Sequence, residues 1–135
     1  NTAWTNKQPP HTLGILCDPA HPALAAFPTE GYSDYQWWDL VSNCNAMVLD
    51  DFPADYRPVV QLVDDWFTNR KLGILLEGKV GNGKLMVCSA DLQKDLDKRP
   101  AARQLRQSIL QYMASGRFNP STSLDPALVK ALYQK

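Results

Sequence analysis

Several common features are missing from this sequence, and each absence argues against a class of protein. The 135 residues include three cysteines, and 14 Lys plus Arg balance 14 Asp plus Glu, so the formal net charge is zero. A neutral balance does not favour nucleic acid or an anionic membrane as a partner. No apolar run approaches the roughly 20 residues that a membrane-spanning helix needs. We therefore expect one domain with one core and no membrane span.

The motifs of several catalytic sites are also missing. The sequence contains no GxSxG, HExxH or P-loop motif. Cys17, Cys44 and Cys88 are far apart and form no CxxC pair, so a zinc site or a disulfide framework is not expected. Asp18, His21 and His11 come nearest to a metal-binding set, but no third close ligand follows the pair at 18 and 21. We expect no catalytic residue, metal or cofactor in this chain.

The start of the chain lacks an initiating methionine and a signal peptide. It opens on Asn1-Thr2-Ala3-Trp4, which reads as the interior of a longer sequence. We expect the chain to be a fragment of a larger protein.

The sequence is organised around residues 32–44, which we expect to form a helix. Ser33 suits the N-cap, and Gln36 can complete a capping box. An apolar stripe then follows at helical spacing: Trp37, Leu40, Val41 and Cys44. Neighbouring helix residues lie roughly 100° apart, so Trp38 and Tyr35 fall at the edge of this stripe or beyond it. The two adjacent indoles therefore call for two different partners.

The remaining elements alternate between short apolar runs and helical patterns. We expect strands at 13–17, 46–49 and 59–63, a helix from Pro100 to Ser115 and a short last helix near 126–132. Gly81-Asn82-Gly83 predicts an antiparallel hairpin over residues 72–89. Strands alternating with helices predict an α/β fold with a mostly parallel sheet and this hairpin at its edge. We divide the chain into an α/β domain, 1–120, and a tail with a short helix, 121–135.

Aromatic residues crowd the first half of the chain. Rings of this kind stack on sugars or anchor protein interfaces, where Trp and Tyr contribute much of the binding energy. They also pack in cores and between domains. The candidates for an interface or a sugar-stacking surface are Tyr35, Trp37, Trp38 and Trp66.

Five segments give the chain a likeness to a known family: 27–30 (FPTE), 36–40 (QWWDL), 57–66 (RPVVQLVDDW), 69–73 (NRKLG) and 99–105 (RPAARQL). The chain resembles the C-terminal accessory region of bacterial family 2 glycoside hydrolases of the β-galactosidase type, common in gut Bacteroidetes. The resemblance implies a three-layer, flavodoxin-like fold of the class I glutamine amidotransferase type. It also implies that the sheet is truncated at the N-terminus, and that the parent enzyme is periplasmic or on the cell surface.

The same resemblance assigns no catalytic residue here. The family's catalytic carboxylates lie on a separate barrel of roughly 250 residues, which this chain is too short to contain. The leading hypothesis is a non-catalytic accessory domain that packs against other domains of its parent polypeptide or forms a homo-oligomer. The alternatives are a carbohydrate-binding module that uses surface Trp and Tyr, and a vestigial amidotransferase-like enzyme with Cys17 or Cys88 as nucleophile.

Overall fold

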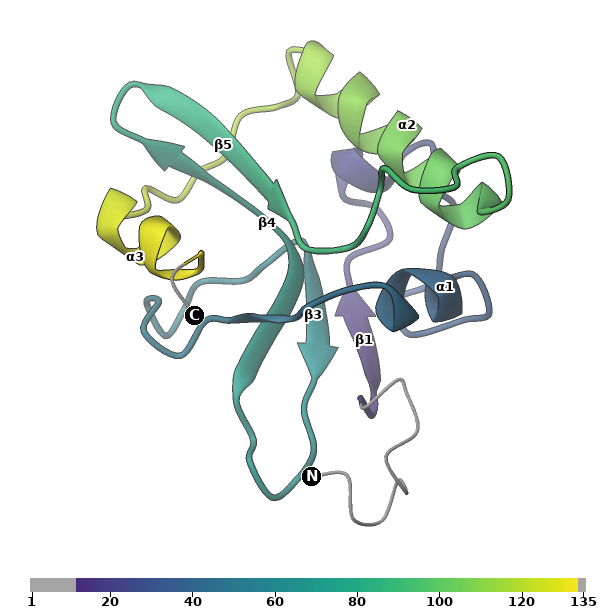
Figure 1. Cartoon of the computed structure of the whole chain (residues 1–135). Coiled ribbons are helices and arrows are strands. Elements are labelled where there is room, and N and C mark those ends of the chain that lie inside the picture. The colour runs from purple at the N-terminus through teal and green to yellow at the C-terminus, as the bar shows by residue number, and fades with distance from the viewer. Residues whose placement is uncertain (1–11, 134–135) are drawn as a thin grey trace.

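A single antiparallel sheet forms the centre of the computed structural model, which describes residues 12–133 (Figure 1). The strands are β1 (Gly14–Cys17), β2 (Met47–Val48), β3 (Val60–Val63), β4 (Lys71–Val80) and β5 (Gly83–Cys88). The helices are the 3-10 turn η1 (Pro22–Leu24), α1 (Trp37–Ser42), α2 (Pro100–Ala114) and α3 (Pro126–Ala131). These elements lie close to the segments that the sequence predicts.

The long strand β4 connects the whole sheet. The strand order is β1-β3-β4-β2, and β5 pairs with the second half of β4, from Leu75 to Val80. All four pairings are antiparallel. Lys79 of β4 also forms an isolated parallel bridge with Ser123, which lies in the segment that leads to α3.

The predicted parallel, flavodoxin-like α/β fold is therefore wrong. A parallel crossover needs about a dozen or more residues, usually with a helix. Only residues 64–70 connect β3 to β4, and only Gly81 and Asn82 connect β4 to β5, so both pairs must be antiparallel. The one long helix, α2, follows the last strand and connects no two strands. The alternation of short elements predicted where the strands lie in the sequence, but not whether paired strands run parallel or antiparallel.

The hairpin expected over residues 72–89 is present as β4 and β5. Gly81 has a φ of 58°, a left-handed conformation that glycine adopts without steric strain. This conformation lets a two-residue turn reverse the chain. The hairpin extends beyond the other strands of the sheet in Figure 1.

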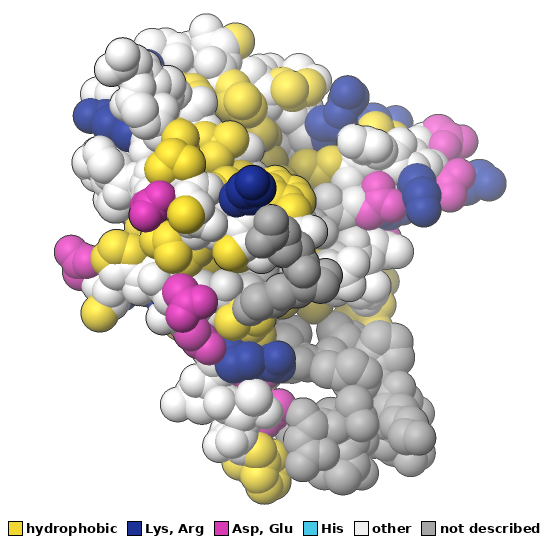
Figure 2. All heavy atoms as spheres, turned by 60° about the vertical axis from the view of Figure 1, so that its left-hand side comes forward, with side chains coloured by type: hydrophobic (Ala, Val, Ile, Leu, Met, Phe, Trp, Pro, Cys, Tyr) yellow, Lys and Arg dark blue, Asp and Glu magenta, His cyan; other side chains and the backbone are white. Residues whose placement is uncertain are grey.

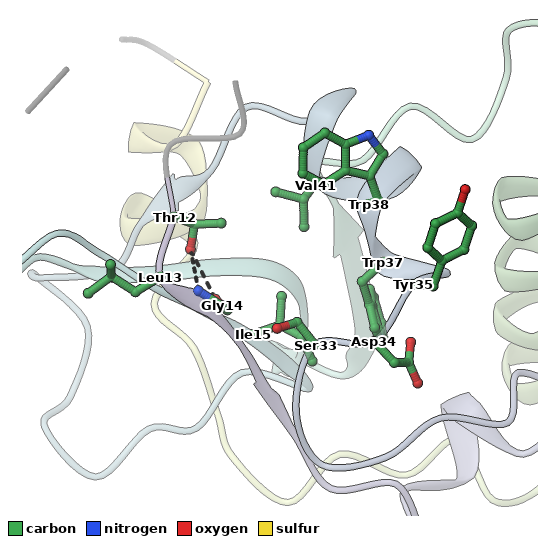
Figure 3. Close-up of a pocket in the computed structure, with 10 residues that line it drawn as sticks. All are labelled: Thr12, Leu13, Gly14, Ile15, Ser33, Asp34, Tyr35, Trp37, Trp38 and Val41. Carbon is green, nitrogen blue, oxygen red and sulfur yellow. Dashed lines mark hydrogen bonds between the residues drawn. The ribbon is translucent and has the colours of Figure 1, made fainter. Parts of the chain in front are cut away.

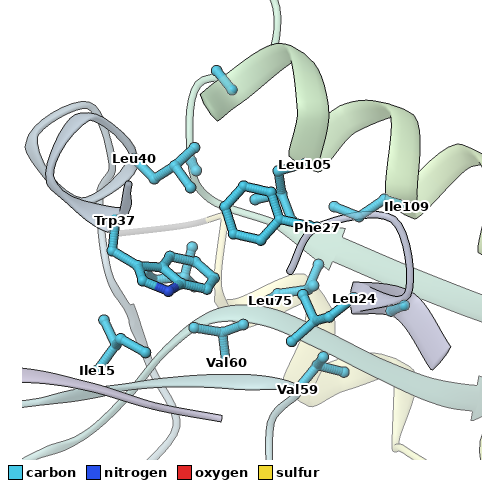
Figure 4. Close-up of a cluster of buried hydrophobic side chains, with 14 of the residues drawn as sticks. Ile15, Leu24, Phe27, Trp37, Leu40, Val59, Val60, Leu75, Leu105 and Ile109 are labelled. Carbon is cyan, nitrogen blue, oxygen red and sulfur yellow. The ribbon is translucent and has the colours of Figure 1, made fainter. Parts of the chain in front are cut away.

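The two faces of the sheet carry separate cores, and β4 contributes to both. Leu75 and Leu76 are adjacent and point to opposite faces, as neighbours on a strand do. The first core packs α1, η1 and α2 against one face, around side chains that include Trp37, Phe27, Leu40 and Leu105 (Figure 4). The second core covers the other face. It gathers Met47, Leu49, Phe52, Tyr56, Leu76, Val87 and Leu124.

The segment after residue 121 packs on the second core. Leu124 is buried there, and Leu128, Val129 and Leu132 from the α3 region are partly buried beside it. Figure 2 brings this side of the molecule forward and shows apolar side chains between charged ones. The expected short helix of the tail is α3.

The helix that carries the two indoles is shorter than predicted. It begins at Trp37 and ends at Ser42, and Gln36, not Ser33, precedes its first residue. The Gln36 side-chain amide donates to the carbonyl of Pro28, so it does not form the predicted capping box with Ser33. Residues 35 and 36 form a turn that leads into the helix.

Candidate functional site

Two adjacent indoles on α1 take opposite roles. Trp37 is 1% exposed; its ring meets Phe27 edge-on at 5.2 Å, and its Nε1 donates to Thr29 Oγ1 at 2.7 Å. Trp38 is 59% exposed, and Tyr35 is 94% exposed. The indoles of Trp37 and Trp38 leave the helix in opposite directions (Figure 3). Tyr35 and Trp38 form what we call the aromatic ridge, whereas Trp37 belongs to the core and offers no ring face to a ligand.

The first hollow lies between α1 and β1, on one side of the ridge (Figure 3). It has a volume of about 390 Å³, and Leu13, Ile15 and Val41 give it a mostly apolar wall. Asp34 also lines it, and Oδ1 of this residue is buried without a hydrogen-bond partner in the described part of the chain. A buried acceptor without a partner costs about 1–3 kcal/mol.

The second hollow lies on the other side of the ridge, against the start of α2. It has a volume of about 550 Å³, and both Tyr35 and Trp38 line it. The opposite wall carries Lys98, Arg99 and Arg103, and Asp39 of α1 also lines the hollow. The ridge therefore separates an apolar hollow from a basic one.

Arg99 is held in place from several sides. Its Nε donates to both carboxylate oxygens of Asp39, at 3.1 and 2.9 Å, and its Nη1 donates to the Lys94 carbonyl at 3.1 Å. Asp91 Oδ1 lies 3.9 Å from Nη1. The Nη2 group is buried and has no hydrogen-bond partner among residues 12–133. The sequence pattern did not single out Arg99, because its partner Asp39 lies 60 positions away.

Trp66 is separate from the ridge. It lies in the connection between β3 and β4, where its ring contacts Phe67 at 5.9 Å, and it lines neither hollow. It is 62% exposed. Of the four predicted residues, the structure thus places Trp38 on α1 and Tyr35 in the turn before it at one surface, Trp37 in the core and Trp66 elsewhere.

Comparison with protein families finds a match that covers almost the whole chain. Residues 1–134 match the family described as “Domain of unknown function (DUF8487)”. The chain belongs to this family. No curated protein matches the DUF8487 chain. The family's description states no activity. The function is therefore inferred from the aromatic ridge and the two hollows beside it.

A partly buried polar cluster that the sequence did not predict lies around Glu77 of this DUF8487 domain. Glu77 Oε1 meets His21 Nε2 at 3.1 Å, and Oε2 accepts from the Tyr112 hydroxyl at 2.6 Å. Burial acts to raise the pKa of Glu77, but the contacts with His21 and Tyr112 together outweigh it and lower this pKa below its ordinary value. His21 Nδ1 accepts from the Ala23 amide, so both ring nitrogens of His21 are occupied. The cluster ties η1, β4 and α2 together through these hydrogen bonds.

The three thiols of the domain do not resemble activated nucleophiles. Cys17, Cys44 and Cys88 are free. Burial raises the pKa of each thiol, and that of Cys88 to about 11. Reactive cysteines instead have a lowered pKa, because the thiolate is the nucleophile. This finding argues against the Cys-nucleophile alternative.

Metal binding and membrane insertion find no support in the part that the structure describes. Between residues 12 and 133, no three or more His, Cys, Asp or Glu side chains are placed to hold a metal ion. Asp18 and His21 lie in this part, whereas His11 lies outside it. None of the described helices is long and apolar enough to cross a bilayer.

Proposed function

We propose that this DUF8487 chain is a non-catalytic binding domain, which docks through its aromatic ridge onto another domain of its parent polypeptide or onto a second copy. The observation that carries the proposal is Trp38, more than half exposed at the rim shared by two hollows, with Tyr35 beside it. Trp and Tyr are the residues that most often dominate interface energies, and they do so next to pockets that a partner fills.

The polar groups of the chain support a binding role. The raised pKa values of the thiols leave them poorly suited to nucleophilic catalysis. Neither hollow is lined by a histidine or a cysteine.

The link to family 2 glycoside hydrolases remains a prediction. The resemblance implied a flavodoxin-like fold that this chain does not have. We therefore base the docking role on the ridge and its hollows. A glycoside hydrolase parent and a periplasmic or cell-surface location are expectations that the complete reading frame of the gene would test.

Sedimentation velocity over a range of concentrations tests the docking role. The uncovered ridge should make the wild-type chain self-associate as concentration rises, because exposed aromatic surface favours burial. Trp38→Ala should abolish that concentration dependence. Tyr133→Ala is the matched control, since Tyr133 is similarly exposed and lies beyond α3. Wild-type and Trp38→Ala chains that are both monomeric at every concentration would count against docking onto a second copy.

A second candidate function is carbohydrate binding. It is favoured by the exposed rings of Trp38 and Tyr35 beside the mostly apolar first hollow, since the apolar faces of sugars stack on aromatic rings. Titration with galactosides, xylosides and plant polysaccharide fragments should then change the Trp fluorescence of the wild type but not of Trp38→Ala. No change at millimolar sugar would eliminate this candidate.

A further inference from the structure

The wall of the second hollow opposite the ridge carries an excess of positive charge. Arg99 already pairs with Asp39, so that these two charges compensate each other. Lys98 and Arg103 are exposed on the same wall, and neither has an ion-pair partner within residues 12–133. The whole chain is neutral, so this local excess is a property of the hollow rather than of the molecule.

The Arg99 guanidinium is oriented before any ligand arrives. Its side chain is 13% exposed, and the bonds to Asp39 and to the Lys94 carbonyl fix its plane. Its Nη2 group is buried and has no hydrogen-bond partner among residues 12–133. The guanidinium is therefore a fixed part of the wall, and the exposed side chains of Lys98 and Arg103 supply the donors that a carboxylate can reach through charge-assisted hydrogen bonds.

The start of α2 adds to the positive electrostatic potential of the second hollow. This 15-residue helix begins at Pro100, on the wall of the hollow, and Arg99 makes no side-chain cap bond to it. No acidic residue lies in its first turn. The partial positive charge of a helix N-terminus is therefore not offset locally, and it reinforces the adjacent cations.

We propose that the second hollow is a carboxylate-binding site, which receives an Asp or Glu side chain of an acidic segment in the docking partner. A neighbouring apolar residue of that segment lies against Trp38. The charge excess selects an anionic group, and the combination of Arg, Trp and Tyr around one hollow is typical of protein interfaces. This inference rests on the proposed docking function, because it names what the partner brings to the ridge.

Selection from a phage-displayed library of random peptides on the folded wild-type chain tests the inference. We expect enriched peptides to carry Asp or Glu next to an apolar or aromatic residue. A synthetic enriched peptide is then titrated, by fluorescence anisotropy, into the wild type and into variants. Lys98→Glu combined with Arg103→Glu should weaken binding by about ten-fold or more, since like charges then face each other.

The control is Arg106→Glu combined with Lys130→Glu, which changes the net charge equally at exposed positions outside the second hollow. It should leave the affinity within about two-fold of wild type. Enrichment of peptides without acidic residues, no enrichment, or equal effects of the two double variants would overturn the inference. Binding of trigalacturonate to the hollow in place of any peptide would overturn it in favour of an acidic sugar.

Trp38→Ala separates the two proposals in the same assay. If Trp38→Ala abolishes peptide binding while charge reversal at Lys98 and Arg103 does not weaken it, the docking role of the ridge is supported and the carboxylate site is contradicted. If charge reversal weakens binding while Trp38→Ala has no effect, the basic hollow stands and the ridge loses its proposed role.

Discussion

Two adjacent tryptophans show how strongly the environment of a residue determines its role. Trp37 and Trp38 share a residue type and a helix, yet one is enclosed by the first core and the other lies on the surface. The expected helical phase placed Trp37 on the buried stripe and Trp38 outside it, and this part of the sequence interpretation agrees with the structure. The roles of these two positions could be predicted because helical periodicity is local.

Alanine substitutions at these two positions should change the free energy of unfolding by very different amounts. Trp37→Ala removes a core ring and its bond to Thr29, and should reduce the free energy of unfolding by about 3–5 kcal/mol. Trp38→Ala should change it by no more than about 0.5 kcal/mol, since the residue is largely exposed. Urea unfolding followed by far-ultraviolet circular dichroism measures both. Equal losses would mean that Trp38 is structural and would remove the reason to assign it to docking.

Asp64 is a buried carboxylate that should make the stability depend on pH. Its side chain is 3% exposed; Arg70 donates to Asp64 Oδ2 from both its Nε and its backbone amide, at 2.9 Å each. The hydrogen bonds from the Arg70 side chain, aided by backbone amides, lower the pKa of Asp64 below its ordinary value of 3.8. The unfolded chain therefore binds this proton more tightly. The stabilisation is present above pH 3.8 and is lost as the pH falls through the lower, folded-state pKa.

Asp64→Asn should destabilise the chain at pH 7 by about 1–3 kcal/mol, because the substitution removes charge-assisted bonds in a buried setting. The difference from wild type should shrink as the pH falls below 3.8. Thermal unfolding from pH 7 down to pH 3 checks this, with Asp51→Asn at an exposed position as the control. A difference that stays constant across this range would contradict the assignment.

At the scale of elements, the strands and helices were largely predictable and their directions were not. Gly81-Asn82-Gly83 encodes its turn locally, so the β4–β5 hairpin followed from the sequence. The pairing of β1 with β3 joins Gly14 to Val63, residues far apart in the chain, and no local pattern specifies it. The Arg99–Asp39 pair and the Glu77 cluster were missed for the same reason, since their members come from distant segments.

Gly78 tests how the hairpin docks on the second core. A Cβ at this position would overlap the buried side chain of Leu124. Gly78→Ala should therefore destabilise the chain by about 1–3 kcal/mol through overpacking. Gly116→Ala is the control, because nothing lies within 4 Å of its added Cβ.

A double variant sharpens that test. When Leu124→Ala has already opened the space, Gly78→Ala should cost at least about 1 kcal/mol less than it does alone, because the two residues are in contact. Additive effects of the two substitutions in chemical unfolding would show that Leu124 does not pack on the hairpin as described.

At the scale of the whole molecule, the sheet and helices form a stable support for one exposed surface. The first core fixes α1 against the sheet through Trp37 and Leu40, and the same helix presents Trp38 outward. Arg99 joins the start of α2 to α1 through Asp39, so the ridge and the basic wall keep one geometry. A surface fixed in this way loses little conformational entropy when a partner binds.

Hydroxyl-radical footprinting with mass spectrometry on the natural polypeptide tests the docking role most directly. Tyr35 and Trp38 are compared with Tyr32 and Tyr133, which are similarly exposed in this structure. The docking account predicts that Tyr35 and Trp38 are oxidised several-fold more slowly than Tyr32 and Tyr133, relative to the intrinsic reactivity of each residue type. Oxidation of all four at their intrinsic rates would show that nothing covers the ridge and would contradict the account.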